Sequence, residues 1–141
     1  MDEAGKIRMG EALDWGSLEN YLRKKMHLKE EPMAVQQFHG GHANLSYLLK
    51  FGQEEFVLRR PPFGKIAPGA HDMKREFNVL SRLHQVYPRA PRAYLYCDNM
   101  DIIGAPFVIL ERRKGIVVRY KIPEVFRSYD GIEERLSRAL V

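Results

Sequence analysis

A glutamate on the apolar side of a predicted helix constrains the fold of this chain more than any other residue. The segment HDMKREFNVLSRLH predicts that helix, because apolar side chains recur at helical spacing at Met73, Phe77, Leu80 and Leu83. Glu76 lies three residues after Met73 and four before Leu80, so it projects from the apolar stripe. A carboxylate is costly to bury unless a cation meets it. The helix therefore has to pack against an element that supplies a positive charge.

Arg59 is the cation that we expect to meet Glu76. It ends the predicted strand FVLR, and only a short basic loop separates that strand from the helix, so the two elements can pack together. A cation on a strand, held by a glutamate on the following helix, is how kinase-like folds direct positive charge at nucleotide phosphates. The pair therefore predicts a phosphate-binding site.

Three short strands are predicted ahead of this helix. They cover residues 34–38, 45–51 and 55–60, which are rich in β-branched, aromatic and leucine side chains. Glycines mark the two turns between them, and a proline-rich basic loop follows the third strand. Two hairpins in succession make an antiparallel meander.

Further elements complete an expected α+β fold. A lead-in helix is predicted at residues 14–26. Two strands at 93–97 and 106–111 are expected beyond the central helix, joined by a loop at 98–104. The result is a five-stranded, mostly antiparallel sheet with one packed helix. The amphipathic segment from Ile132 has no stop signal and ends on apolar residues, so we expect a truncated C-terminal helix.

Composition limits the class of protein. With 141 residues, 45% of them apolar, the chain can bury one ordinary core, in which the single cysteine, Cys97, is expected to be a half-buried thiol. The net charge of +5 favours an anionic partner and does not choose among nucleotide, nucleic acid and membrane surface. No stretch reaches the roughly 18 apolar residues of a membrane helix, and the first residues do not resemble a signal peptide. We expect a cytoplasmic protein with no membrane partner.

The first turn of the meander contains Gly40 and Gly41. Residues without a Cβ let backbone N–H groups approach phosphate oxygens closely. Turn geometry alone also explains a Gly-Gly pair in a hairpin, so both interpretations stay open.

Four segments in order resemble the N-terminal lobe of the aminoglycoside phosphotransferase-like family: QFHGGHANLSYLL, FVLRRPP, AHDMKREFNVLSRL and PRAYLYCDNMDIIGAPFVILERRKG. The resemblance is to the branch fused to, or found beside, acyl-CoA dehydrogenases. It implies a kinase-like fold with a helical lead-in at residues 1–32 and a nucleotide-binding lobe at 33–114. Residues 115–141 are then a linker and the start of a missing C-terminal lobe.

The resemblance also implies a nucleotide-binding role for eight residues. By this resemblance, Gly40, Gly41 and Asn44 belong to the loop over the phosphates. Arg59 takes the role of the phosphate-contacting strand lysine, with Glu76 as its helix partner. Glu111, Arg112 and Arg113 belong to the connector between the two lobes, which contacts adenine in the family. The implied cofactor is ATP, with Mg²⁺ in the full-length parent.

Two departures from the family pattern limit the expected activity. An arginine stands at position 59 where protein kinases have lysine, which keeps the charge and offers a planar fork to phosphate. No segment resembles the His-Gly-Asp catalytic loop or the aspartate of the metal motif, which lie in the family's C-terminal lobe. We therefore expect no catalytic or metal-binding residue here and no phosphoryl transfer by residues 1–141 alone. The acceptor hydroxyl compound and the choice between ATP and GTP are not indicated.

Two other classes of function remain as alternatives. A basic nucleic-acid-binding module would stack bases on exposed aromatic side chains, but the aromatics here are spaced like core residues, which disfavours it. A non-catalytic interaction module would keep the shape of the lobe and pair through its exposed surface, with a second copy of the chain as one partner.

Overall fold

The computed structural model describes residues 3–40, 43–118 and 120–139. It divides into two compact units, one spanning Glu3–Arg113 and one that begins at Lys114. The first unit contains the sheet, both hydrophobic clusters and the candidate site.

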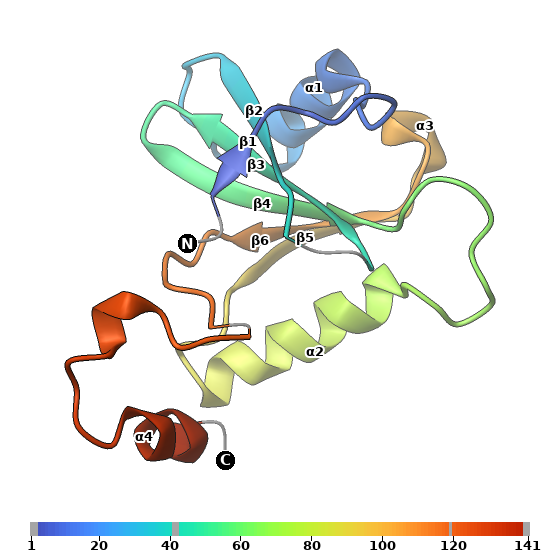
Figure 1. Cartoon of the computed structure of the whole chain (residues 1–141). Coiled ribbons are helices and arrows are strands. Elements are labelled where there is room, and N and C mark those ends of the chain that lie inside the picture. Colours follow the sequence, from blue (N-terminus) through green and yellow to red (C-terminus); the bar gives the residue numbers. More distant parts are fainter. Residues whose placement is uncertain (1–2, 41–42, 119, 140–141) are drawn as a thin grey trace. The chain divides into compact units, whose positions relative to one another are not determined.

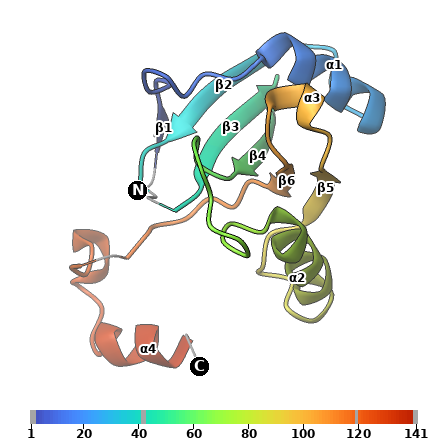
Figure 2. The same ribbon diagram turned by 90° about the vertical axis from the view of Figure 1, so that its right-hand side faces the viewer.

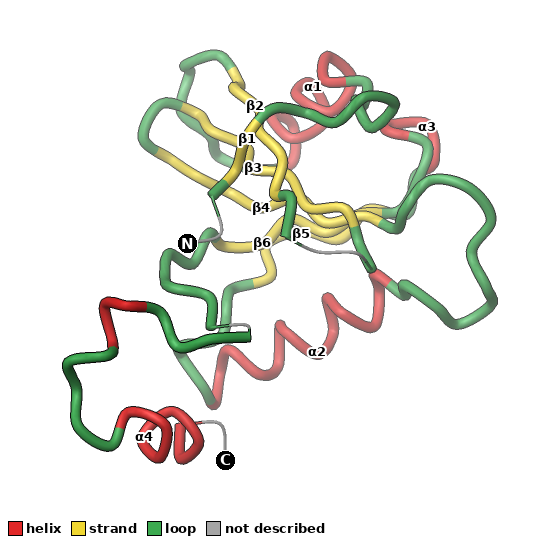
Figure 3. The backbone as a smooth tube through the Cα atoms, viewed as in Figure 1, coloured by secondary structure: helices red, strands yellow, loops and turns green. Residues whose placement is uncertain are grey.

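Six strands form one sheet in the described part of the chain, in the order β1-β2-β3-β4-β6-β5 (Figures 1 and 3). Their bounds are β1 Ala4–Gly5, β2 Met33–Phe38, β3 Leu45–Phe51, β4 Glu54–Arg60, β5 Ala93–Cys97 and β6 Phe107–Glu111. Every neighbouring pair is antiparallel. The meander β2-β3-β4 and the two later strands are confirmed, and β6 lies between β4 and β5.

The prediction of five strands was wrong by one. The additional strand, β1, is only two residues long and pairs Ala4 with Phe38 and Gly5 with Gln37. It is held through the backbone and lacks the run of β-branched or aromatic side chains that identifies a strand in a sequence. A pattern of side chains therefore could not reveal it.

Helices cover both faces of the sheet (Figures 1 and 2). On one face lie α1, Trp15–Lys25, and the short α3, Met100–Ile103; on the other lies α2, Met73–Val86, against β5 and β6. Strand alternation divides the core accordingly. In β4, Leu58 belongs to the cluster with α1, and Val57 packs against the cluster with α2.

Both predicted helix starts are confirmed by their caps. The Asp14 side chain accepts a hydrogen bond from the Ser17 N–H at 3.1 Å, and the Asp72 side chain accepts one from the Arg75 N–H at 3.0 Å. Each aspartate satisfies a backbone donor that the first helical turn leaves unpaired. The two residues therefore determine where α1 and α2 begin.

The segment expected to be a loop at 98–104 contains α3. Asn99 caps this helix through the N–H of Asp101 at 2.9 Å, and Gly104 ends it with a φ of +78°. Both cap signals are visible in the sequence, but four residues are too few to show helical periodicity. The helix was missed for that reason.

A polar network ties the segment before α1 to the sheet. The side chain of Gln37, which is fully buried, accepts from the Arg8 N–H at 2.8 Å and donates to the Glu11 carboxylate. The Tyr47 hydroxyl donates to the Glu11 carbonyl at 2.6 Å. These bonds satisfy the polar groups that are buried on β2 and β3. They also attach the residues before α1 to the sheet.

The second unit contains a 3₁₀ turn at Glu124–Phe126 and α4 at Ile132–Ala139. In α4, Arg138 Nη2 lies 2.6 Å from Glu134 Oε1, one turn earlier. Nowhere in the described ranges is there a helix with the length and apolar character needed to span a membrane.

Candidate functional site

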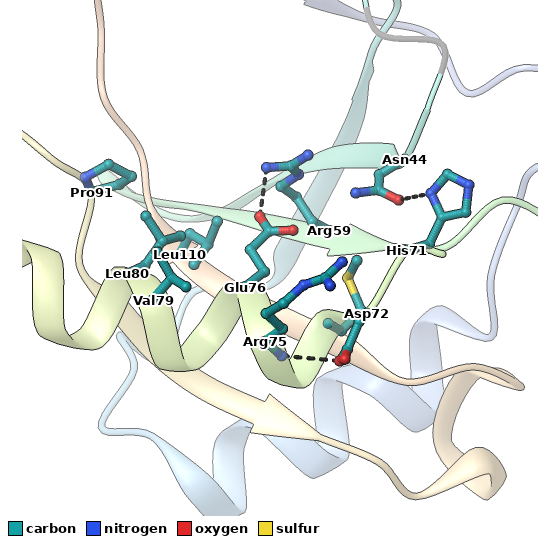
Figure 4. Close-up of a pocket in the computed structure, with 11 residues that line it drawn as sticks. Asn44, Arg59, His71, Asp72, Arg75, Glu76, Val79, Leu80, Pro91 and Leu110 are labelled. Atoms are coloured by element: carbon teal, nitrogen blue, oxygen red, sulfur yellow. Dashed lines mark hydrogen bonds and ion pairs between the residues drawn. The ribbon is translucent and has the colours of Figure 1, made fainter. Parts of the chain in front are cut away.

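The ion pair predicted between Arg59 and Glu76 is present. Arg59 Nη1 in β4 lies 2.5 Å from Glu76 Oε1 in α2 (Figure 4). The side chains are 35% and 18% exposed, so the contact is partly shielded from water. Partial burial strengthens the attraction between two charges, because the effective dielectric constant is lower than in water.

Local sequence explains how the two side chains meet. Side chains alternate along a strand, so Arg59 shares a face of the sheet with Val57, which packs against the α2 cluster. Glu76 lies one turn from Met73 and Leu80, both of which pack against the same face. The apolar contacts of the helix thus hold its carboxylate over the arginine.

A pocket of about 510 Å³ surrounds the pair (Figure 4). Its polar lining is Asn44, Arg59, His71, Asp72, Arg75 and Glu76. Its apolar lining includes Val79, Leu80, Pro91 and Leu110. The pocket therefore combines a polar end at the start of α2 with an apolar end farther along the helix, a combination typical of small-molecule sites.

The pocket contains as many acidic as basic side chains, but their polar atoms are not all hydrogen-bonded. The carboxylate of Glu76 is paired with Arg59, and that of Asp72 accepts a backbone hydrogen bond at the helix start. Arg59 Nε is buried and has no hydrogen-bond partner. A buried donor without a partner is uncommon and costs stability.

Asn44 and His71 form a second contact in the pocket. His71 Nδ1 lies 2.6 Å from Asn44 Oδ1, and His71 has a φ of +53°. The amino-acid sequence did not predict this contact. Histidine is among the few residue types enriched at positive φ, but no sequence pattern showed that this one would adopt it.

Of the three residues expected in the loop over the phosphates, one lines the pocket. Asn44 lines the pocket beside Arg59, as its assignment to the phosphate loop requires. Gly40 follows β2 and does not line the pocket. Gly41 lies outside the described residues.

The connector side chains are turned to other parts of the chain. Glu111 Oε2 accepts from the Arg92 N–H at 3.0 Å and lies 3.1 Å from Arg113 Nη2. Arg113 also donates to the Pro88 carbonyl at 2.7 Å. Neither side chain lines the pocket.

The side chain of Arg112 contacts residues of β2 and β4. Its guanidinium carbon lies 4.7 Å from the centre of the Phe38 ring, and its Nε lies 3.9 Å from Glu55 Oε2. Its buried Nε has no hydrogen-bond partner. The predicted adenine-contacting role of 111–113 therefore depends on backbone groups rather than on these side chains.

The strand aromatics Tyr47, Phe51 and Phe56 do not form a stacking surface. Tyr47 and Phe51 are fully buried, and Phe56 packs edge-on against Phe51 and Tyr94. Base stacking requires exposed ring faces. The arrangement gives no support to a nucleic-acid-binding sheet.

Metal-binding side chains are not grouped in the part of the chain that the structure describes. No cluster of three or more His, Cys, Asp or Glu residues there could hold an ion. Cys97 is 2% exposed in the cluster with α1, so the thiol is fully buried and not half-buried as expected.

A family model and a solved structure agree on one family. The sequence model of the phosphotransferase enzyme family matches residues 34–139. A crystal structure from Ralstonia eutropha, provisionally assigned as an aminoglycoside phosphotransferase, is similar with a TM-score of 0.62 and 27% identity. The similarity covers 77% of this chain and 30% of that one.

Two similar curated proteins are named as members of the acyl-CoA dehydrogenase family. The chain is 36% identical over 119 residues to member 11 of Rattus norvegicus, which is 79% of this chain and 15% of that protein. It is 32% identical over 135 residues to member 10 of Mus musculus, which is 95% of this chain and 12% of that protein. The chain thus spans a small part of the length of the relatives it matches.

Proposed function

Because the chain belongs to the phosphotransferase enzyme family, we propose that it is the nucleotide-binding lobe of an enzyme that transfers a phosphoryl group from ATP to a hydroxyl of a small molecule. The observation that carries the proposal is the Arg59–Glu76 pair in a pocket between sheet and helix. In such an enzyme, rate acceleration comes mainly from positioning and from neutralising charge on the phosphates.

The donors of the pocket suit a phosphate chain. Glu76 binds Nη1 of the Arg59 guanidinium, and the arginine side chain is still about a third exposed. Asn44 and Arg75 lie in the same pocket. A planar guanidinium can donate to two phosphate oxygens at once, which favours a multiply charged anion over a neutral ligand.

The position proposed for adenine lies along the same strands. Arg59 pairs with Val108 on β6, and Glu111, at the end of β6, is three residues farther along. Three residues of strand span about 10 Å. Backbone groups of 112–113 would meet the base edge, while Asn44, Arg59 and Arg75 would hold the phosphates.

Catalysis itself is proposed to need residues that this sequence lacks. ATP would supply the phosphoryl group, and Mg²⁺ would join the phosphates in the full-length parent. The general base and the metal-binding aspartate have no counterpart in residues 1–141. The chain alone is therefore proposed to bind nucleotide without transferring phosphate, and its acceptor is left unassigned.

Calorimetric titration with ATP tests the proposal. The unaltered chain should bind ATP, and Arg59→Ala should weaken binding at least tenfold, because the substitution removes a charge that contacts phosphate. Arg138→Ala is the matched control, since it also removes the arginine of an Arg–Glu pair but in α4. It should leave the affinity unchanged.

Three results would contradict the proposal. They are failure of the unaltered chain to bind ATP, equal affinity for ATP in Arg59→Ala, and salt-sensitive binding of single-stranded oligonucleotides that ATP does not displace. Release of phosphate from ATP by the isolated chain would contradict the further statement that it is inactive alone.

A further inference from the structure

His71 occupies a backbone conformation that a residue with a side chain seldom adopts. Its φ is +53°, in the left-handed region, directly before the cap residue of α2. Outliers of this kind persist where the surrounding structure holds them in place, and they concentrate at ligand sites. The conformation therefore calls for an explanation in the contacts of its side chain.

That side chain joins two segments far apart in the sequence. His71 Nδ1 lies 2.6 Å from Asn44 Oδ1, although the two residues are 27 positions apart. Asn44 precedes β3, and His71 precedes α2. Both line the pocket that contains Arg59 and Glu76.

The contact determines which end of the Asn44 amide faces the pocket. With Nδ1–H donating to the amide oxygen, the NH₂ group points away from His71 and toward the Arg59 side of the pocket (Figure 4). An amide NH₂ carries two donors, whereas the amide oxygen is an acceptor. Were the amide reversed, an acceptor would face the same space and repel phosphate oxygens.

We propose that His71 is a positioning residue for nucleotide phosphates, which holds the amide of Asn44 with its donors turned into the pocket. The inference rests on the proposed function, since it presumes that a phosphate occupies this space. His71 itself need not touch the ligand. Its role is to turn the NH₂ group of Asn44 toward the pocket. It also connects the segment before β3 to the start of the helix that carries Glu76.

The variant His71→Gly removes the imidazole and permits the same backbone conformation, so it tests the side chain alone. Glycine adopts positive φ without a steric cost, so the variant should fold with an unfolding midpoint close to that of the unaltered chain. Titration of the full chain with ATP should show about a tenfold loss of affinity, the effect of misdirecting one hydrogen bond to a charged group. Titration with adenosine, which has no phosphate, should show no loss.

Asn44→Ala supplies the second arm of the experiment. It should weaken ATP binding about as much as His71→Gly does, and the double variant should be no weaker than Asn44→Ala alone, because His71 acts through Asn44. This non-additivity is the readout that a merely structural histidine would not give.

Each remaining outcome overturns the inference. Unchanged ATP affinity in His71→Gly, equal losses for ATP and adenosine, or fully additive losses in the double variant would each exclude the positioning role and leave the proposed function intact. Failure of the unaltered chain to bind ATP would overturn both.

Discussion

Arg59 and Arg60 are adjacent on β4 and have opposite surroundings. Arg59 meets Glu76 on the α2 face. Arg60 is 3% exposed on the other face, where it donates to the carbonyls of Pro61 and Ile103 at 2.9 and 3.4 Å. Burial lowers the pKa of Arg60, because a charged group loses hydration there. Strand alternation alone assigns one arginine to the candidate site and the other to the attachment of the loop that follows β4.

Tyr47 provides a prediction at the residue scale. Burial raises the pKa of Tyr47 to about 12, against an ordinary value of 10. Between these two values the folded chain holds the phenolic proton while the unfolded chain releases it. Stability should therefore be constant with respect to this group below pH 10 and fall from about pH 10 to 12 by up to about 1.4 kcal/mol per pH unit.

Urea unfolding at several pH values measures the effect. Tyr47→Phe should be less stable at pH 8, because the hydrogen bond to the Glu11 carbonyl is lost. It should also show a shallower decline above pH 10. Parallel curves for the two proteins above pH 10 would refute the assignment of this titration to Tyr47. Tyr21 contributes a decline of its own, since its pKa is likewise raised to about 12.

At the scale of elements, α2 is the part that assembles the site. It contributes Glu76, and its start is capped by Asp72 next to His71. The helix keeps its orientation through Met73, which is 2% exposed, and through Phe77 and Leu80 against β6. The position of the carboxylate therefore depends on where the helix begins and on which side it buries.

Removing the α2 cap should weaken both the helix and the site. Asp72→Ala should lower the free energy of unfolding by about 1 kcal/mol, because one N–H of the first turn loses its acceptor. Asp72→Asn is the matched control, since asparagine caps about as well. Unfolding in urea gives the comparison. Equal destabilisation by alanine and asparagine would mean that the charge of Asp72, and not its capping, is what matters.

At the scale of the whole molecule, the two compact units differ in their content. The unit Glu3–Arg113 holds the sheet, the helices α1 to α3, both buried clusters and the pocket. The unit that begins at Lys114 holds α4, and none of its described residues belongs to either cluster. Stability of a domain comes mainly from the apolar area that it buries.

A chain ended after Arg113 should therefore keep its cooperative unfolding. Its thermal midpoint is expected within a few degrees of that of residues 1–141, because the buried clusters are intact. Circular dichroism at increasing temperature measures this midpoint. A broad transition in the shorter chain would show that residues after Arg113 contribute to the core.

Much of this architecture could be predicted because its determinants are local. Leu18 and Leu22 recur at helical spacing within the predicted lead-in helix, and aspartate is a favoured cap residue at both places where α1 and α2 begin. The carboxylate of Glu76 on the apolar side of its helix required a cation, and Arg59 on the preceding strand was the predicted one. Periodicity and capping act within a few residues, so a sequence displays them directly.

Other features arise only when distant segments meet. The pairing of β1 with β2, the insertion of β6 between β4 and β5, and the contact of His71 with Asn44 join segments that are not neighbours in the chain. The sequence by itself determined the longer helices and strands and the need for a partner to Glu76, because those follow from short-range spacing and the cost of burying charge. Tertiary structure decided the strand order, the backbone of His71 and the pocket around the pair, because these depend on packing between residues far apart in the sequence.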